Sequence, residues 1–232
     1  MVKFTSENAL RNNQKKKKLE RPSKRSAPKS RTSVRFETGK RSASPVTAVF
    51  LVGFMGAGKT SVGRTLGQRL NWAFEDLDDR IQQRERRTIA EIFRDSGELE
   101  FRRAEHNALR QVVEELRGGA AKVVALGGGA FVQPNNADLL KVLGAKTLFL
   151  DAPVEDLWSR CCQQASEAGT ERPLLQSRQQ FDELHRARRK IYLRASKRID
   201  TGGRSIEAVA LDIIRKLSLK KLSLRSQQGE IE

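Results

Sequence analysis

The stretch from Gly53 to Thr60 constrains the fold of this chain more than any other feature. It reads Gly-Phe-Met-Gly-Ala-Gly-Lys-Thr and so fits the phosphate-binding pattern G-x-x-x-x-G-K-[ST]. An apolar run at 48–52 precedes it, and apolar residues recur after it at helical spacing, at Val62, Leu66 and Leu70. Strand, glycine-rich loop and helix N-terminus together direct backbone N–H groups and a helix dipole toward an anion. The segment therefore predicts a buried parallel strand that leads into a nucleoside triphosphate site.

Each position of this loop has an expected role at a bound polyphosphate. The glycines let the backbone approach the phosphates without Cβ clashes. Lys59 is expected to reach the outer phosphates, and the Thr60 hydroxyl to take one Mg²⁺ position. A glycine-rich turn that merely precedes a helix is the alternative, but it does not explain why all four motif positions and both flanks agree. The residues predicted to contact the nucleotide here are Gly56, Ala57, Gly58, Lys59, Thr60 and Ser61.

The charge of the chain is concentrated in its first 45 residues. The formal net charge is +17, and residues 1–45 carry 14 Lys or Arg against 3 Glu. Because this segment is poor in apolar residues, we expect a disordered basic extension. It would either contact nucleic acid or another acidic surface, or remain a solvated extension without a partner. The folded part is expected to be one domain at 46–217, followed by a C-terminal tail at 218–232.

The remaining composition favours a reducing, aqueous compartment. The two cysteines are adjacent, at Cys161 and Cys162, and this spacing suits neither a disulfide framework nor a metal site. No apolar run approaches the length of a membrane span, and the N-terminus lacks the apolar core of a secretory signal. We therefore expect a cytoplasmic protein without membrane contact, in which the cysteine pair contributes to packing.

Two acidic residues stand at the end of the next expected strand, at 73–78. If that segment is extended, Asp76 and Asp78 point the same way. They would then be able to hold a hydrated Mg²⁺ and to accept hydrogen bonds from a substrate hydroxyl. If a helix begins there instead, acidic residues are favoured by the helix dipole alone. The spacing leaves both interpretations open.

A capping box at 88–91, with Thr88 and Glu91, predicts the start of a short helix, and Ser96-Gly97 predicts its end. A longer helix is expected at 98–116. Arg102 and Glu105 lie three positions apart on it and are expected to form an ion pair. That pair belongs on the surface unless the local geometry turns Arg102 into a cleft.

The rest of the chain continues the alternation of strands and helices. Strands are expected at 122–126, 147–150 and 198–201, and helices from 154, at 178–194 and at 206–217. The first of these strands ends in Gly127–Gly129, which either lets a ligand approach the backbone or forms a flexible turn. Residues 163–177 lose helical periodicity, and a lid that carries Arg172 is expected there. The alternation predicts an α/β fold with a five-stranded parallel sheet and helices on both faces.

Taken together, these motifs resemble the shikimate kinase family, within the P-loop kinases that are similar to nucleoside-monophosphate kinases. The resemblance covers residues 46–216. It rests on the phosphate loop, on Asp-Leu-Asp at 76–78, on Gly-Glu-Leu-Glu-Phe-Arg-Arg-Ala-Glu at 97–105, on Leu-Gly-Gly-Gly-Ala at 126–130, on Arg-Pro-Leu-Leu at 172–175, and on Arg188 four positions before Tyr192. The basic extension is not part of the family pattern.

The resemblance implies ATP- and Mg²⁺-dependent phosphorylation of the 3-hydroxyl of shikimate, a step toward chorismate and the aromatic amino acids. It also implies a three-layer P-loop kinase architecture with a mobile lid, and a monomer. Another small-molecule kinase of the same group, such as a gluconate kinase, is one alternative. The other is a nucleotide-binding regulator that binds nucleic acid through its basic extension, although residues 1–45 show no helix-turn-helix pattern.

The resemblance also implies a role for each residue of the site. The implied catalytic residues are Lys59, Asp78 and Arg172. The implied shikimate-binding residues are Asp78, Arg102, Gly127, Gly128, Gly129 and Arg188, of which the two arginines would hold the carboxylate. Beyond the phosphate loop, the implied nucleotide-binding residues are Arg160, Arg172 and Arg204. The implied metal ligands are Thr60 and Asp76. Glu105 would orient Arg102, while Phe93 and Phe101 would form an apolar wall.

Overall fold

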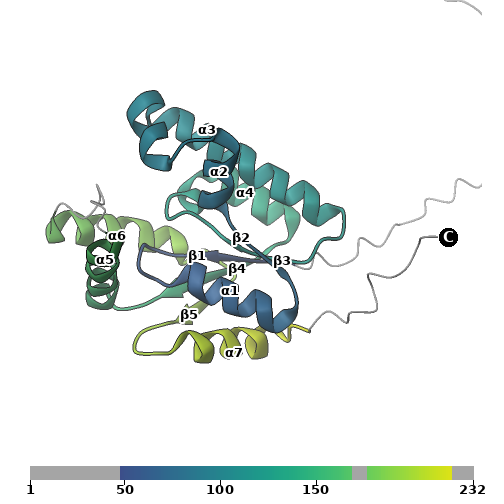
Figure 1. Ribbon diagram of the computed structural model, residues 1–232. Coiled ribbons are helices and arrows are strands. Elements are labelled where there is room, and N and C mark those ends of the chain that lie inside the picture. Colours follow the sequence, from purple (N-terminus) through teal and green to yellow (C-terminus); the bar gives the residue numbers. More distant parts are fainter. Residues whose placement is uncertain (1–47, 169–176, 221–232) are drawn as a thin grey trace, which may run out of the picture. The chain divides into compact units, whose positions relative to one another are not determined.

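Five parallel strands form the centre of the molecule, and they run in the spatial order β2-β3-β1-β4-β5 (Figure 1). The strands are β1 (Ala48–Val52), β2 (Ala73–Asp76), β3 (Lys122–Ala125), β4 (Lys146–Asp151) and β5 (Lys197–Asp200). The computed structural model describes residues 48–168 and 177–220. The five strands and their parallel arrangement confirm the fold predicted from the sequence.

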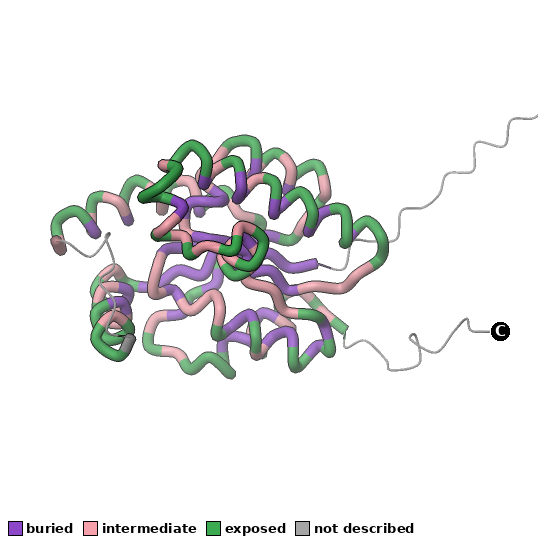
Figure 2. Tube along the Cα trace, turned by 45° about the horizontal axis from the view of Figure 1, so that its top comes forward, coloured by how far each residue is buried: buried purple, intermediate pink, exposed green. Residues whose placement is uncertain are grey.

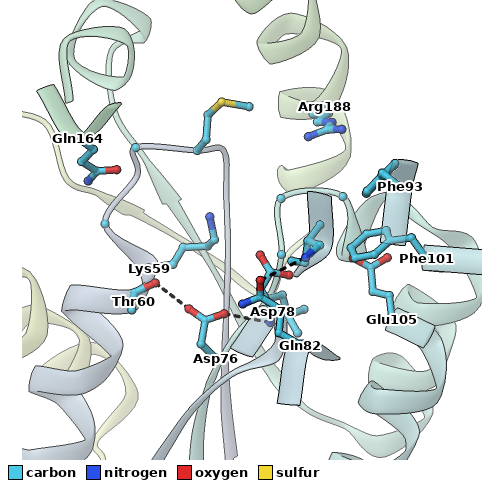
Figure 3. Close-up of a pocket in the computed structure, with 18 of the residues that line it drawn as sticks. Lys59, Thr60, Asp76, Asp78, Gln82, Phe93, Phe101, Glu105, Gln164 and Arg188 are labelled. Carbon is cyan, nitrogen blue, oxygen red and sulfur yellow. Dashed lines mark hydrogen bonds between the residues drawn. The ribbon is translucent and has the colours of Figure 1, made fainter. Parts of the chain in front are cut away.

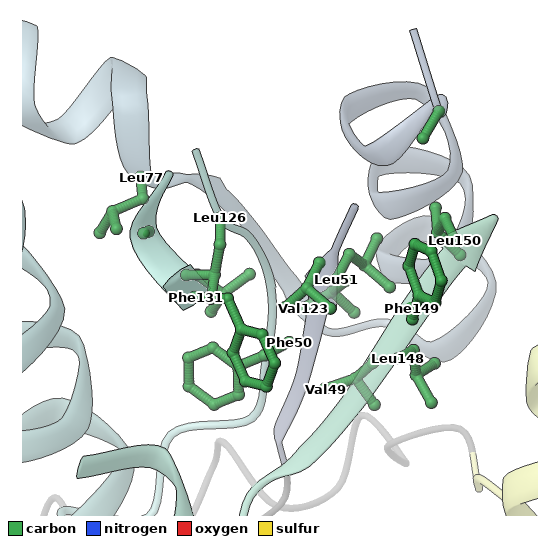
Figure 4. Close-up of a cluster of buried hydrophobic side chains, with 14 of the residues drawn as sticks. Val49, Phe50, Leu51, Leu77, Val123, Leu126, Phe131, Leu148, Phe149 and Leu150 are labelled. Atoms are coloured by element: carbon green, nitrogen blue, oxygen red, sulfur yellow. The ribbon is translucent and has the colours of Figure 1, made fainter. Parts of the chain in front are cut away.

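Strand β1 is the most deeply buried element of the sheet. All five of its residues are buried, because β3 and β4 pair with it on either side and helices cover both faces. Leu51 pairs with Ala125 on β3 and with Leu148 on β4. Figure 4 shows the side chains of these strands, among them Val49 and Phe50, packed in one apolar cluster. A strand in this position must be apolar on both faces, which explains its unbroken run of apolar residues.

Helices cover the sheet on both sides. Helices α1 (Lys59–Leu70) and α7 (Ile206–Leu217) lie on one face, and α3 (Ile89–Arg117) and α4 (Pro134–Leu143) lie on the other (Figure 1). Helix α2 (Leu77–Glu85) precedes α3, while α5 (Val154–Ala168) and α6 (Arg178–Tyr192) lie side by side at one end of the strands. Figure 2 shows that buried residues gather in the sheet and along one side of the helices, as expected of amphipathic helices.

The acidic segment after β2 is a helix start and not an extended strand. Asp76 is the N-cap of α2, and its Oδ1 atom accepts a hydrogen bond from the Asp78 backbone N–H at 3.1 Å. The strand expected at 73–78 therefore ends two residues earlier, at Asp76, and of the two alternatives that the sequence left open the structure shows the helix start. The helix-start interpretation describes the backbone correctly, because a short carboxylate at an N-cap satisfies an otherwise unpaired backbone N–H.

Helix α3 begins and bends where the sequence predicts. Thr88 is its N-cap, and the reciprocal hydrogen bonds of the capping box with Glu91 are both present. Gly97 interrupts the helix with φ 78° and ψ 175°, so the first helical turns and the longer second part meet at a kink. A residue with a side chain is strained at this positive φ, whereas glycine adopts it freely.

Three other local expectations differ from the structure. Helix α5 continues to Ala168, although apolar residues stop recurring at helical spacing from Gln163 onward. The apolar pattern ends because the last turns face solvent, and a 3.0 Å hydrogen bond from Gln163 to Glu167 supports the helix there. Helix α4 was not predicted. Of the two cysteines, Cys161 is buried, as packing requires, but Cys162 is exposed.

Several predictions fall outside the described residues, namely the basic extension at 1–45, the lid with Arg172, and the tail from 221 onward. Within the described ranges, no helix has both the length and the apolar character that crossing a bilayer needs.

Two glycines in the same left-handed conformation allow a test of how closely the phosphate loop packs. Gly56 has φ 77°, and a Cβ atom there would lie 2.6 Å from the carbonyl oxygen of Leu157; Gly144 has φ 68°, and nothing lies within 4 Å of its Cβ position. Both alanine variants incur the left-handed strain, roughly 1–2 kcal/mol. Only Gly56→Ala should lose a further 1–3 kcal/mol, roughly, through overpacking. Urea unfolding measures both, and equal losses would contradict the proposed packing.

Candidate active site

A cavity of about 680 Å³ lies where the phosphate loop, the acidic start of α2, the kinked part of α3 and the glycine triplet meet (Figure 3). Its lining includes Lys59 and Thr60 at one end, Asp78 near the middle and Arg188 toward the other end (Figure 3). Arg102 also lines it. The phosphate loop, the start of α2 and the glycine triplet directly follow β1, β2 and β3 at their carboxyl ends, which is where ligands bind in open α/β sheets. Arg188 comes from α6, later in the chain. The cavity therefore joins the predicted phosphate site to the predicted acceptor residues.

The phosphate loop enters α1 through Gly58, the N-cap, whose φ is 85°. Lys59 folds over this loop, and its Nζ atom donates to the carbonyl oxygens of Gly53 at 3.0 Å and Phe54 at 3.1 Å. Burial lowers the pKa of Lys59, while the nearby carboxylates of Asp78 and Asp76 oppose that shift. The ammonium group is thus held beside the N-terminus of α1, where the helix dipole favours a bound anion.

Thr60 and Asp76 form the oxygen-rich corner of the cavity. The Thr60 hydroxyl donates to Asp76 Oδ2 at 2.7 Å, while Asp76 Oδ1 accepts the Asp78 backbone N–H. Hydroxyl and carboxylate oxygens suit Mg²⁺, which commonly takes its other ligands from phosphates and water. The described part of the chain contains no group of three or more His, Cys, Asp or Glu residues that could hold a metal ion. The corner fits a Mg²⁺ ion bound together with a polyphosphate.

Asp78 points into the cavity from the first turn of α2 (Figure 3). Burial, and next the charge of Asp76, raise its pKa to about 6, while Lys59 and Arg102 oppose the shift. A carboxyl group with this pKa can accept a proton near neutral pH.

Arg102 belongs to the cavity and not to the outer surface. Its guanidinium group donates to Glu105 Oε2 at 3.0 Å and to Glu98 Oε1 at 3.0 Å. Glu105 is 1% exposed, and its Oε1 atom makes no hydrogen bond with any described residue. Burial raises the pKa of Glu105 to about 7, against the effect of Arg102. The sequence left open whether Arg102 lies on the surface or in a cleft, and the structure places it in the cleft.

An apolar wall closes the cavity beside Arg102. The rings of Phe93 and Phe101 lie 4.6 Å apart between centroids, and the Arg102 guanidinium lies 5.1 Å from the Phe101 ring. Figure 3 shows both rings at the end of the cavity that holds Glu105. An anion bound to Arg102 would thus sit next to an apolar surface that excludes water.

The glycine triplet passes between the charged side chains at very short range. A Cβ atom at Gly127 would lie 2.5 Å from Oδ1 of Asp78, and one at Gly129 would lie 2.5 Å from Nη1 of Arg102. At Gly128, Nη1 of Arg188 would be 3.5 Å away. Side chains at 127 or 129 would push these groups aside, so the triplet is a site of close approach and not simply a flexible turn.

The structure brings some of the predicted site residues together and leaves others apart. Arg160 lies beside the phosphate loop and donates to the carbonyl oxygens of Gly56 at 3.4 Å and Thr201 at 3.1 Å. Arg204 does not line the cavity; it binds Asp212 at 3.1 Å and nearby carbonyl oxygens. Ala57, within the loop, is buried and does not line the cavity. Arg172 lies outside the described residues.

Two glutamines of the lining were missed in the sequence. Gln82 lies one helical turn after Asp78, and its Oε1 atom accepts the Ile89 backbone N–H at 3.2 Å. Gln164 lines the cavity one turn after Arg160 (Figure 3). Helical spacing from Asp78 and from Arg160 was the available signal, but it required knowing that α2 exists and that α5 extends beyond Gln163.

Comparisons with known proteins agree on one family. The family model described as shikimate kinase matches residues 55–218. The shikimate kinase of Persephonella marina is 36% identical over 170 residues, 73% of this chain and 98% of the relative. That of Geobacter sulfurreducens is 41% identical over 168 residues, 71% of this chain and 87% of the relative. A solved structure, the shikimate kinase from Acinetobacter baumannii in complex with shikimate, has a TM-score of 0.66 at 33% identity, covering 77% of this chain and 96% of that one.

The raised pKa of Asp78 predicts that this carboxylate destabilises the fold. Because the folded pKa of about 6 lies above the ordinary aspartate pKa of 3.8, the wild type should lose stability as the pH rises between these values. Asp78→Asn removes that loss and should raise the free energy of unfolding at pH 7 by up to about 3 kcal/mol. Urea unfolding at pH 7 and pH 4 measures the difference.

The control is Asp79→Asn, which changes an exposed carboxyl group one position later on α2. It should leave stability nearly unchanged at both pH values. An Asp78→Asn variant no more stable than the wild type at pH 7 would show that the carboxylate is not under electrostatic strain.

Proposed function

The chain belongs to the shikimate kinase family, and we propose that it transfers the γ-phosphoryl group of ATP to the 3-hydroxyl of shikimate. One observation carries the assignment of roles within this chain. The glycine triplet lies within contact range of Asp78, Arg102 and Arg188 in a cavity that Lys59 also lines. One small molecule in the cavity would thus meet a carboxylate that can bind its hydroxyl groups, two arginines that can bind its own carboxylate, and a phosphate site.

Arg102 and Arg188 hold the shikimate carboxylate in this proposal. Guanidinium groups match the planar, two-oxygen geometry of a carboxylate and bind it through paired charged hydrogen bonds. The buried Glu105 carboxyl, 3.0 Å from Arg102, restricts the guanidinium to an orientation that faces the cavity. The apolar rings of Phe93 and Phe101 then cover the clamp and strengthen its electrostatic attraction by excluding water.

Asp78 binds the ring hydroxyls and accepts the proton of the attacking 3-hydroxyl. Its pKa of about 6 keeps most of it ionised at neutral pH while leaving it basic enough for proton transfer. The backbone of the glycine triplet, which approaches Asp78 without intervening side chains, supplies further hydrogen-bonding groups to the ring. These contacts orient the hydroxyl toward the phosphate end of the cavity.

Lys59 and Arg172 stabilise the negative charge on the transferring phosphoryl group. Phosphoryl transfer depends mainly on positioning and on such electrostatic stabilisation. The loop residues Gly56–Ser61 hold the phosphates through backbone N–H groups, and Arg160, beside Gly56, lies on the nucleotide side. The assignments of Arg172 and Arg204 rest on the family resemblance.

Thr60 and Asp76 hold the Mg²⁺ ion, and their 2.7 Å hydrogen bond keeps both oxygens at one corner of the phosphate site. When bound, the ion neutralises phosphate charge. The protein's own contribution is to fix these oxygens, since both carboxylate oxygens of Asp76 are oriented by protein donors. A cytoplasmic location and a monomeric state remain predictions from the sequence, as does the role of residues 1–45.

The decisive experiment measures ADP release from ATP and Mg²⁺ with shikimate, beside gluconate, other hydroxy acids and nucleoside monophosphates. We expect turnover with shikimate alone. Asp78→Asn should lower kcat at least about 100-fold, because general base catalysis typically contributes this much. Turnover with gluconate instead would favour the rival kinase activity. ATP binding without turnover of any acceptor would favour a nucleotide-binding regulator.

The glycine triplet provides a separate test of the carboxylate clamp. Gly129→Ala displaces the Arg102 guanidinium, since the new Cβ would lie 2.5 Å from Nη1. The KM for shikimate should rise at least about tenfold, as expected when a charged hydrogen bond is lost, while the KM for ATP stays constant. Gly144→Ala is the control: Gly144 lies outside the cavity lining, nothing lies within 4 Å of its Cβ position, and both KM values should stay unchanged. An unchanged KM in Gly129→Ala would argue against Arg102 as a shikimate ligand.

A further inference from the structure

Tyr192 lies just behind the cavity without lining it. It is 1% exposed on the last turn of α6, and its ring lies 5.3 Å from that of Phe149 on β4, between centroids. Its hydroxyl donates a hydrogen bond to the carbonyl oxygen of Gly128. Burial raises the pKa of Tyr192 to about 12, and the adjacent Arg188 only partly opposes the shift. The hydroxyl therefore remains a protonated donor at any physiological pH.

The carbonyl that Tyr192 holds is the centre of the glycine triplet. On one side of it, Gly127 approaches Asp78, and on the other, Gly129 approaches Arg102; both Cβ positions would be 2.5 Å from a side-chain atom. No side chain stands between this backbone and the charged groups to absorb a displacement. A shift of a few tenths of an ångström in the triplet would therefore be transmitted directly to Asp78 and Arg102.

Tyr192 is also linked to the third charged group of the acceptor site. Arg188 lies four residues earlier on α6, so the two side chains share one side of the helix. A Cβ atom at Gly128 would lie 3.5 Å from Nη1 of Arg188 and 3.9 Å from the Tyr192 hydroxyl. The hydroxyl thus connects the helix that carries Arg188 to the turn that borders Asp78 and Arg102.

From these contacts we infer that Tyr192 is a positioning residue for the acceptor: its hydroxyl fixes the Gly128 carbonyl, and through it the spacing of Asp78, Arg102 and Arg188 around shikimate. The inference rests on the proposed function. Tyr192 itself touches neither the acceptor nor the phosphates. Its effect is on the geometry of groups that do.

A purely structural role is the competing explanation. A buried hydroxyl bonded to a carbonyl stabilises a fold wherever it lies, and its removal leaves a buried acceptor unpaired. Thr147, at the start of β4, offers a matched case: it is 6% exposed, and its hydroxyl oxygen lies 3.1 Å from Ser196 Oγ and accepts the Ser196 backbone N–H at 2.9 Å. The two explanations differ in what they predict for shikimate and not in what they predict for stability.

The test compares Tyr192→Phe with Thr147→Val in the full-length protein. Both variants should lower the urea midpoint by similar amounts, because each loses one buried hydroxyl. Tyr192→Phe should in addition raise the KM for shikimate on the order of tenfold, the effect of about one hydrogen bond, with the KM for ATP unchanged. Thr147→Val should leave both KM values unchanged. An unchanged KM for shikimate in Tyr192→Phe, or equal rises in both KM values, would overturn the inference.

A spectroscopic measurement provides a second readout, because Tyr192 is the only tyrosine of the chain. Protein labelled with ¹³C at tyrosine Cζ gives a single resonance. Shikimate should shift this resonance, since it binds beside the Gly128 carbonyl and Arg188, whereas a non-hydrolysable ATP analogue alone should not. A resonance that does not respond to saturating shikimate would also overturn the inference.

Failure of the proposed function is distinguishable from failure of this inference. The former appears in the wild type, as absence of turnover with shikimate, and would remove the basis of the inference as well. The latter appears as normal wild-type turnover together with an unaffected KM in Tyr192→Phe.

Discussion

The part of the cavity proposed to bind shikimate depends on one close contact. The glycine turn after β3, which carries no side chains, lies directly against two charged side chains. Asp78 and Arg102 come from helices that follow β2, while Gly127–Gly129 follows β3, the neighbouring strand. Their approach to within 2.5 Å of the Cβ positions is possible only because the turn carries no side chains. The parallel sheet therefore does more than bury a core: its register determines which strand ends meet and how closely.

The same geometry has a cost in stability. Asp78 and Glu105 are both held where burial raises their pKa, and Lys59 is held where burial lowers it. Each of these groups would be better solvated in an unfolded chain. The site keeps them because opposite charges lie nearby and because a bound substrate would bring its own charges: phosphates for Lys59, and a carboxylate for the arginine that Glu105 orients. Activity and stability are thus expected to oppose one another at these positions.

The sequence predicts the local features of this chain well, but it predicts less well which segments distant in sequence contact one another. The phosphate loop, the strand before it and the Thr88 capping box depend on short-range rules, and all three are found as predicted. The start of α2 was left open, because Asp76 and Asp78 suit both a strand end and a helix cap. The cleft position of Arg102, and the presence of Gln82 and Gln164 in the lining, depend on packing between distant segments that no local pattern encodes. Family resemblance supplied the roles, but not these contacts.

The central claim is that one carboxylate is held jointly by two arginines from α3 and α6, and a double-mutant cycle tests it most directly. Calorimetric titration of shikimate into the wild type, Arg102→Lys, Arg188→Lys and the double variant gives four values of Kd. The account predicts that each single change weakens binding by at least about tenfold and that the second change costs less than the first, because the clamp acts as a unit. Unchanged Kd values in both single variants would contradict it.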